Sequence, residues 1–551
     1  MKKLNKRTRK FAAVSTFVLG GLLSLSFAEG YFEISKNLEI FTAVYRELNT
    51  FYVDETQPGE LMKTSIDAML KSLDPYTVYY PESKIEDYRF MTTGQYGGIG
   101  AKVNTIDGKI TIIEPYEGFS AALAGLKAGD VVIAVDGLSV VGKNHNEISD
   151  LLKGQNGTTL VLTIERLNSP EPIDISITRA EIQVPDIPYH GMIDDKTGYI
   201  ALSSFTKTAS AEVKKSFLAL KDEGMEQLVF DLRGNGGGLL REAVNIVNLF
   251  VPKGTEVVST KGKLEEWNKT YSALNPPLDT EIPIIVLIDD RSASASEIVS
   301  GTLQDLDRAV ILGQRSFGKG LVQQTKDLSY NTKMKLTVAK YYTASGRCIQ
   351  KLNYSERDET GKVKEVPDSL IKPFFTAGGR DVFDGRGIDP DVYMEPVKES
   401  NMLSALLNNY VIFDFATAYA QGRDSIAAPE DFVLSDVEYA EFRQYALDQD
   451  FELNTQTELL LSRLEETAAE ERYMQVAEQA FADLKSKLTP DKERDLDLFK
   501  AEIKKALENE IVSRYYYSQG AIRFGLKNDV LIDRSLSTFA SDYYSILQVQ
   551  P

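Results

Sequence analysis

The spacing of apolar residues divides this chain into regions with different hydrophobic patterns. Between residues 36 and 91, apolar residues recur every three or four positions, as Leu38, Phe41 and Val44 do, which predicts amphipathic helices. Between residues 94 and 182 the pattern changes to short β-type runs separated by glycines. This second hydrophobic pattern predicts a small β-rich domain.

A third hydrophobic pattern follows between residues 198 and 342, where strand-like apolar runs alternate with helical stretches. The strand-like runs cover residues 199–202, 228–232, 284–288, 310–312 and 336–338. Such alternation predicts an α/β core.

The remaining third of the chain is the least informative part. Residues 353–384 are polar and contain glycines, which predicts a surface insertion. From residue 401 onward the chain is helical and charged, and Thr489-Pro490-Asp491 predicts an N-cap with proline at the first helical position. We expect this tail to be a packing or docking module.

Together these hydrophobic patterns predict a multidomain α+β protein. Its expected parts are a leader at residues 1–28, a helical region at 29–93, the β-rich domain at 94–182, the α/β core at 183–400 and a helical domain at 401–551. With 551 residues, of which 43% are hydrophobic and 26% charged, the chain is long and apolar enough to fold into several packed domains.

The first 28 residues have the composition of an export signal. Six cations occur in the first ten residues, and an apolar stretch then runs to a Ser-Phe-Ala sequence at residues 26–28. A buried core helix fits this pattern poorly, whereas a cleaved signal or an uncleaved membrane anchor both fit it. Either one predicts an exported protein of the periplasm or cell envelope.

Charge and residue counts exclude several functions. Removing residues 1–28 deletes six cations and no acids, so the formal charge changes from −19 to −25, which disfavours nucleic acid as a partner. The single cysteine, Cys348, cannot form an intrachain disulfide. The only histidines are His145 and His190, and Cys348 has no companion at ligand spacing, so we expect neither a metal site nor a cofactor.

The serine-rich segment at residues 289–298 is the first candidate for catalysis. Ser292, Ser294 and Ser296 follow a buried strand and precede an apolar-periodic run, which predicts a strand-to-helix turn. The free N–H groups of a helix start can stabilise the oxyanion of an acyl transfer. Serines before a helix are more often caps, so the segment alone does not decide the function.

Lys319 is the candidate base. It lies between two glycines in the segment 313–323, among apolar residues, and a lysine acts as a neutral base only when desolvation lowers its pKa from ~10.4. The alternative is a solvated surface lysine. The same segment nearly matches a phosphate-binding loop, but Gly320 stands where Ser or Thr would bind magnesium, which argues against a nucleotide site.

Glycine-rich loops provide further candidates. The turn at residues 230–239, Phe-Asp-Leu-Arg-Gly-Asn-Gly-Gly-Gly-Leu, can supply an oxyanion donor, or it can be an ordinary tight turn. In the β-rich domain, Tyr96-Gly-Gly-Ile-Gly and the segment 125–137 can expose N–H groups to a terminal carboxylate. Glycine turns also occur in any small β domain.

These segments together resemble the carboxyl-terminal processing peptidases, also called tail-specific proteases. The resemblance covers about residues 36–395 and keeps the family's motif order. The matching motifs are Leu73-Asp-Pro, Tyr96-Gly-Gly-Ile-Gly, Gly125-Leu-Lys-Ala-Gly-Asp, Asp231-Leu-Arg-Gly-Asn-Gly-Gly, Ser292-Ala-Ser-Ala-Ser-Glu, Phe317-Gly-Lys-Gly-Leu-Val-Gln and Gly387-Ile-Asp-Pro-Asp.

The resemblance implies roles for individual residues. Ser294 corresponds to the nucleophile, Lys319 to the base, and Gln323 to a glutamine positioned against the lysine. The N–H groups of Ala295 and Gly237 correspond to the oxyanion donors. Asp305 also matches a family acid, which we interpret as structural or supporting.

The family also implies a PDZ domain and a peptidase core of the crotonase-like type. The PDZ domain is expected to bind apolar C-terminal tails of protein substrates and can gate the active site. Its expected binding residues are Gly97, Gly98, Ile99 and Gly100. No motif after residue 400 can be transferred, and the helical regions offer surfaces for a homo-oligomer or an adaptor.

We therefore predict a serine endopeptidase with a Ser-Lys dyad that cleaves exported proteins near their C-termini. The alternative is a non-catalytic PDZ-containing scaffold of the bacterial envelope. A metal-dependent protease and a nucleotide-binding protein would differ from both by sensitivity to chelators and by magnesium-dependent nucleotide binding.

Overall fold

The computed structural model describes residues 32–453 and 455–548, so the predicted leader at residues 1–28 lies outside the described residues. Within these two ranges, no helix combines the length and the apolar character needed to cross a membrane. The chain divides into two compact units, the first consisting of the described residues up to Pro81 together with Lys326–Leu336 and the second of the remaining described residues.

The first unit is built mainly from two helices. Residues 32–51 form one helix, and α2 (Pro58–Lys71) forms the other, with proline at its first position, where a missing N–H costs nothing. The buried Asp74 then accepts hydrogen bonds from the backbone of Tyr76 and Thr77, which turns the chain into strand β1 (Val78–Tyr80). Within this unit β1 pairs antiparallel with residues 333–335.

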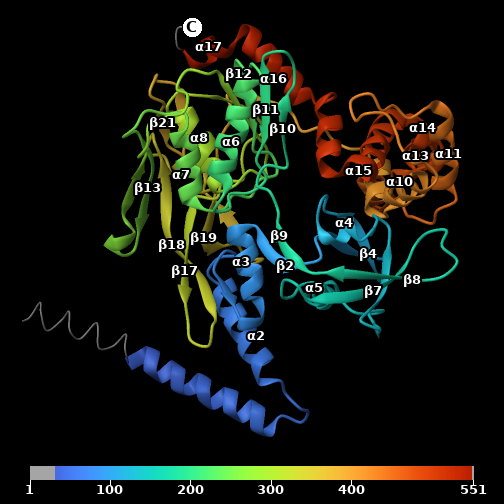
Figure 1. The fold of residues 1–551 in the computed structure, drawn as a ribbon, viewed down its shortest axis with the longest axis horizontal. Helices are drawn as coiled ribbons and strands as arrows, with labels where there is room; N and C mark the ends of the chain where they lie inside the picture. The colour runs from blue at the N-terminus through green and yellow to red at the C-terminus, as the bar shows by residue number, and fades with distance from the viewer. Residues whose placement is uncertain (1–31, 454, 549–551) are drawn as a thin grey trace, which may run out of the picture. The chain divides into compact units, whose positions relative to one another are not determined.

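The β-rich domain of the second unit is a sheet with strand order β3-β4-β5-β7-β8, of which Figure 1 labels β4, β7 and β8. Alternate residues of β7 are buried, which is the period-two pattern of a strand with one face on a core. Strand β3 lies at the edge of the sheet. The bounds are β3 (Ala101–Ile106), β4 (Lys109–Pro115), β5 (Val131–Val135), β6 (Leu138–Ser139, paired with β5), β7 (Thr159–Glu165) and β8 (Ile173–Thr178), with helices α4 (Ser120–Leu123) and α5 (His145–Leu152).

A short pair of strands lies at the two ends of this domain. β2 (Gln95–Gly98) pairs antiparallel with β9 (Ala180–Gln183), so residues 82 to 88 positions apart in the chain are brought together. Helix α3 (Ile85–Thr93) leads into β2 and ends at Gly94, whose φ of 68° favours glycine.

The α/β core contains a six-stranded sheet with the order β10-β11-β12-β15-β16-β23. All neighbours pair in parallel except β10, which is antiparallel to β11. The predicted α/β alternation is confirmed. The bounds are β10 (Tyr189–Met192), β11 (Thr197–Ala201), β12 (Gln227–Asp231), β15 (Ile284–Ile288), β16 (Val310–Gly313) and β23 (Val392–Tyr393).

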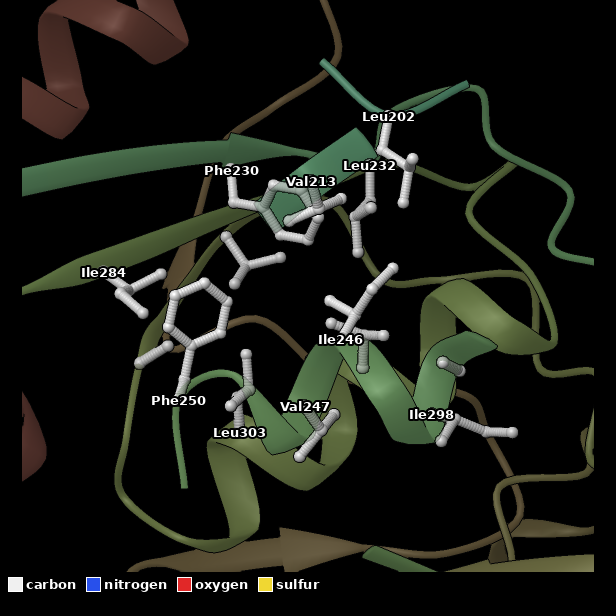
Figure 2. Packing of buried hydrophobic residues seen from close by; sticks show 14 of the residues in the cluster. Leu202, Val213, Phe230, Leu232, Ile246, Val247, Phe250, Ile284, Ile298 and Leu303 are labelled. Atoms are coloured by element: carbon white, nitrogen blue, oxygen red, sulfur yellow. The ribbon is translucent and has the colours of Figure 1, made fainter. Parts of the chain in front are cut away.

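One face of this sheet packs against α6 (Ala209–Asp222), α7 (Leu240–Asn248) and α8 (Ala295–Asp305). Figure 2 shows Phe230 and Leu232 from the sheet side of the cluster above Ile246 of α7. Because side chains alternate along a strand, Leu228 and Phe230 face this cluster and Val229 faces the opposite one. Strands that are buried on both faces of a sheet have continuous apolar sequences, and the strands of this sheet have them.

The opposite face of the sheet is covered by the last two helices of the chain, α16 (Val530–Ser541) and α17 (Tyr543–Leu547) (Figure 1). Ile532 and Tyr543 are buried against the strands, and the Tyr543 hydroxyl accepts the N–H of Ile284 at 2.8 Å. The helical region expected after residue 401 therefore includes helices that complete the α/β core.

Most of the helices before them share a separate hydrophobic cluster in the second unit. Its elements are α9 (Asn401–Asn408), α10 (Val411–Gln421), α11 (Asp436–Leu447), α14 (Lys492–Leu498) and α15 (Lys500–Leu526). Helices α12 (Gln456–Glu470) and α13 (Met474–Leu488) pack against each other. The prediction of an N-cap at Thr489 is wrong. Asp491 caps α14, because its carboxylate accepts the N–H of Arg494 at 2.7 Å, and Pro490 precedes the cap.

The predicted insertion forms two small antiparallel pairs, β19 (Leu352–Arg357) with β20 (Val363–Glu365), and β21 (Pro373–Phe375) with β22 (Asp381–Phe383). Most of it is exposed, but the Arg380 side chain is only 9% exposed and pairs with Asp307 and Asp391 of the core at 2.7 and 2.5 Å. The insertion is thus fixed to the C-terminal end of α8.

Candidate active site

The serine-rich segment forms a sharp turn between β15 and α8. The Asp289 carboxylate holds this turn by accepting the N–H groups of Ser292 and Arg291 at 3.0 and 3.1 Å. Ser294 is the last residue before the helix, and its φ of 58° is unusual for a residue with a side chain. Such strained turns occur where a side chain must be presented at a fixed point.

The three serines of the turn differ in what their hydroxyls do. Ser292 is fully buried and donates to the carbonyl of Leu232 at 2.8 Å. Ser296 is also fully buried and donates to the carbonyl of Asn235 at 2.8 Å. Ser294 is partly exposed. Two hydroxyls therefore hold the fold together, and of the three serines Ser294 alone is partly exposed.

Glu297 connects the serine turn to the lysine loop. Its carboxylate is completely buried in the first turn of α8, and Oε2 accepts the backbone N–H groups of Ser294 and Lys319 at 2.7 and 2.9 Å. Oε1 accepts the Ser316 hydroxyl at 2.6 Å and the Gly318 N–H at 2.7 Å. Because one oxygen binds the backbone of both Ser294 and Lys319, the structure brings these two residues together.

Burial raises the pKa of Glu297, and its hydrogen bonds from Ser316, Lys319, Ser294 and Gly318 oppose that effect. Four donors satisfy the acceptor capacity of an ionised carboxylate. The ionised form is therefore the one that can hold both segments at once. A neutral carboxyl would have to turn one oxygen into a donor.

The lysine loop is also held from outside. Gly320 donates its N–H to the buried Gln350 side chain at 2.8 Å, and the Lys351 N–H donates to the Gly318 carbonyl at 2.9 Å. Gly318 has a φ of +86°, and a Cβ there would lie 2.5 Å from that of Lys351. The glycines flanking Lys319 thus permit close packing against residues 349–351, and Lys319 itself is partly buried.

The glycine-rich turn after β12 contacts the serine turn. A Cβ at Gly237 would lie 2.8 Å from both the Ala295 nitrogen and the Ser294 Cβ, so the structure brings these three residues together. The Asn235 carbonyl accepts the N–H of Ala293 at 3.0 Å. The Gly237 N–H, however, donates to the Asn235 Oδ1 at 2.8 Å, so an incoming oxyanion would have to displace that amide oxygen.

Gln323 and Asp305 make contacts away from the serine turn. Gln323 lies on β17 (Leu321–Asp327), and its amide donates to the Thr337 hydroxyl at 3.2 Å. Asp305 is buried at the end of α8, where it pairs with the buried Arg347 at 2.8 Å and accepts the Ser345 N–H at 2.9 Å. These bonds are those of a structural residue.

The four residues expected to bind substrate lie at the start of the β-rich domain. Gly97 and Gly98 belong to β2, and the Gly97 carbonyl accepts the N–H of Gly154 at 3.0 Å. The Ile99 side chain is buried in the domain core, and Gly100 has a φ of +76°. The backbone of this loop, rather than the Ile99 side chain, is therefore available to a ligand. Gly97 also lines a hollow of about 510 Å³.

Three contributors to this site were not identified from the sequence. Glu297 was quoted within a motif in the sequence analysis but was given no role of its own. A signal was present, because a carboxylate at the third position of a helix is the usual partner of a capping serine. Tyr341 is completely buried and donates its hydroxyl to the Ser294 carbonyl at 3.1 Å. Neither Tyr341 nor Gln350 has a sequence signal, because both come from strands or loops distant in the chain.

Three family models and several curated relatives match this chain. A model of peptidase family S41 matches residues 196–356, a PDZ-domain model matches 111–166, and a model of the C-terminal helical domain of probable PDZ-proteases matches 402–539. A carboxy-terminal-processing protease of Bartonella bacilliformis is 40% identical over 319 residues, which cover 57% of this chain and 73% of the relative.

The chain belongs to the carboxy-terminal-processing proteases of peptidase family S41.

A second relative, the carboxy-terminal processing protease CtpA of Bacillus subtilis, is 33% identical over 336 residues, covering 60% of this chain and 70% of the relative. Among solved structures, a photosystem II D1 C-terminal processing protease is 26% identical and covers 65% of this chain and 92% of its own, with a TM-score of 0.35.

Family membership decides between the functions considered from sequence. The protein is a serine-type carboxy-terminal-processing endopeptidase with a PDZ domain, and its substrates are proteins. A non-catalytic scaffold is not favoured. The tail, in which no motif was recognised, matches the helical domain of probable PDZ-proteases over most of its length.

Proposed function

We propose that Ser294 and Lys319 form the catalytic dyad of this peptidase. The observation that carries the proposal is the buried Glu297 carboxylate, whose Oε2 binds the backbone N–H of both residues. The partial exposure of Ser294, beside two buried serines with committed hydroxyls, supports the same assignment. Gln323 is proposed to assist Lys319, and Ala295 and Gly237 to supply the oxyanion donors.

In the first half-reaction, the Ser294 Oγ attacks the scissile carbonyl carbon while the neutral Lys319 amine accepts the hydroxyl proton. The resulting oxyanion is stabilised by the N–H groups of Ala295 and Gly237, the latter released from Asn235. The carbon–nitrogen bond then breaks, and Lys319 returns the proton to the leaving amine. Ser294 is left as an ester of the substrate's N-terminal fragment.

In the second half-reaction, water attacks the ester carbonyl and gives its proton to Lys319. The ester bond breaks, and the proton returns to the Ser294 oxygen. Because the free amine is the active form of Lys319, the rate is expected to rise with pH. A rate that stays flat from pH 5 to 9, with chemistry rate-limiting, would argue against a lysine base.

The test is mass spectrometry of an unstructured protein with an apolar C-terminal tail, incubated with residues 29–551. The same protein is incubated separately with Ser294→Ala and Lys319→Ala. Cleavage by the parent enzyme alone is the expected result and assigns both roles. Cleavage by all three proteins would contradict the dyad.

We further propose that the PDZ domain binds the substrate tail along β3. This strand lies at the edge of its sheet, so its outer side can pair with an extended peptide. The carbonyls of Ile99 and Gly100 already accept the N–H groups of Ala121 and Tyr116, which leaves the N–H groups of the loop as donors for a terminal carboxylate. Amidating the C-terminus of the test peptide should therefore weaken binding.

The helix at residues 32–51 is proposed to support self-association. Leu38, Phe41, Val44 and Leu48 recur every three or four residues and are exposed, as in the seam of a helix pair. Sedimentation of residues 29–551 should show an oligomer, and Leu38→Glu with Leu48→Glu should shift it to the monomer. A parent that sediments as a monomer would contradict the proposal and favour an adaptor as the partner of this face.

The leader is proposed to export the protein to the periplasm or cell envelope. Its six cations and apolar run support this localisation, and residues 1–28 remain either a cleaved signal or an anchor. Mass measurement of the N-terminus of the protein isolated from cells separates the two. The domain boundaries at residues 93, 182 and 400 are likewise proposals.

A further inference from the structure

The last helices of the chain approach the glycine-rich turn of the active site. Helix α15 leaves helical geometry at Tyr517, with a φ of 54°, and after it the chain enters α16 at Asp529. The Asp529 carboxylate caps α16, since its Oδ1 accepts the N–H of Leu531 at 2.9 Å. This cap uses one of the two carboxylate oxygens.

The second oxygen of Asp529 binds the core. Oδ2 lies 2.8 Å from Nη2 of Arg233, and the two side chains are only 18% and 24% exposed. Arg233 also donates from Nε to the Asp231 oxygens at 3.0 and 2.9 Å. The guanidinium is thus held between a carboxylate at the end of β12 and a carboxylate at the start of α16.

Arg233 is the residue that begins the glycine-rich turn. On the far side, this turn is fixed to the serine turn, because the Asn235 carbonyl accepts the Ala293 N–H and the Ser296 hydroxyl. On the near side, its anchors are the Gly234 N–H, which donates to Asp289 at 2.9 Å, and the Arg233 side chain. Movement of Arg233 would therefore shift the near end of the turn that carries Gly237.

Asp529 adds a restraint that Asp231 alone does not supply. The Arg233–Asp231 pair joins residues two positions apart, and Asp231 also accepts the Tyr199 hydroxyl of β11 at 2.7 Å, so this pair ties the guanidinium to the sheet alone. Asp529 comes from an element about 300 residues later, and the positive end of α16 stabilises its charge. A guanidinium with donors fixed on two separate elements cannot rotate freely.

We propose that Asp529 is a positioning residue for the peptidase reaction: it holds the oxyanion turn in place through Arg233. The C-terminal segment is then part of the catalytic apparatus, although it contributes no group that touches the substrate. This inference rests on the proposed role of the Gly237 turn. Since an oxyanion forms only during the reaction, loss of this restraint lowers kcat and leaves KM unchanged.

The test compares Asp529→Asn and Asp529→Ser with Asp533→Asn in the enzyme of residues 29–551. Asparagine and serine both remain good N-caps, so α16 keeps its cap while Arg233 loses a charged partner. Asp533 lies on an exposed position in the first turn of the same helix, and it provides the matched loss of charge. Each variant is measured for kcat and KM on a fluorogenic peptide with an apolar C-terminus, and for its thermal unfolding midpoint.

The expected result is a fall in kcat of about tenfold for both Asp529 variants, smaller than the 10²–10³ lost with a whole oxyanion donor. KM and the unfolding midpoint stay near the parent values, and Asp533→Asn matches the parent. A kcat equal to the parent's in both Asp529 variants would overturn the inference. A fall in kcat that is explained by a lower unfolding midpoint, or a change in KM with kcat unchanged, would also overturn it. Activity of Ser294→Ala in the same assay would instead overturn the proposed dyad.

Discussion

At the scale of single residues, Glu297 organises the proposed dyad. Its buried carboxylate accepts the backbone N–H groups of Ser294, Gly318 and Lys319 and the side-chain hydroxyl of Ser316. Buried carboxylates are expensive unless their lone pairs are satisfied, and here all four bonds come from the two catalytic segments. The cost of burying this charge therefore fixes the relative position of the serine turn and the lysine loop.

Replacing Glu297 by glutamine should disrupt both segments, because one carboxylate oxygen becomes an NH₂ donor facing N–H donors. We expect Glu297→Gln to lower kcat by at least about tenfold, with stability reduced by about 1–3 kcal/mol. Steady-state kinetics and urea unfolding measure the two effects. The exposed Glu226→Gln is the control, and it should match the parent.

The Glu297→Gln variant also tests how the titration of Glu297 makes the free energy of unfolding depend on pH. Burial raises the pKa of Glu297 in the folded protein above the ordinary 4.5, so the folded state keeps this proton to higher pH than the unfolded chain. The free energy of unfolding of the parent, minus that of Glu297→Gln, should therefore fall as pH rises from about 4.5 through the folded pKa. A difference that increases with pH over this range would contradict the shift.

At the scale of elements, the site lies at the turns that leave β12, β15 and β16 at the carboxyl ends of parallel strands. This edge collects the loops that follow each strand, so segments distant in sequence meet there. The strand-to-helix turn around Ser294 was predictable from an apolar run followed by a helical pattern. The Tyr341 and Gln350 contacts were not, because they depend on packing between elements rather than on local sequence.

Gly237 provides a test of the contact between two of these turns. Its φ is +95°, and a Cβ there would lie 2.6 Å from the Ala293 carbonyl oxygen and 2.8 Å from the Ala295 nitrogen. Gly237→Ala should therefore lower kcat/KM at least about 100-fold, comparable to loss of an oxyanion donor. Gly236→Ala is the control, since a Cβ there meets nothing within 4 Å. Equal activity of the two variants would contradict the contact.

At the scale of the whole molecule, the C-terminal helices are divided between two tasks. The sequence pattern predicted helices after residue 401 but not which surfaces they cover, because an amphipathic pattern does not name the partner of its apolar face. In the structure, α9, α10, α11, α14 and α15 share their own hydrophobic cluster, and α16 and α17 cover a face of the core sheet. The continuous apolar runs of the strands had indicated only that both faces are buried.

This division predicts where the tail matters for stability. Ile532 of α16 is 1% exposed against the core sheet, so Ile532→Ala should lower the free energy of unfolding of the core by about 2–5 kcal/mol. Val530, on the same helix, is 46% exposed, and Val530→Ala should change it by less than about 1 kcal/mol. Urea unfolding measures both, and equal small effects would mean that α16 does not pack on the sheet.

The most direct test of the account is to locate the acyl-enzyme. An acid-quenched single turnover, digested with trypsin, gives the peptide 292–308, which contains Ser292, Ser294 and Ser296 of the turn and Ser300 of α8. Fragmentation of this peptide identifies the serine that carries the ester of the substrate's N-terminal fragment. We predict an ester on Ser294. An ester on Ser292, Ser296 or Ser300, or turnover with no ester on any of the four serines, would contradict the proposed mechanism.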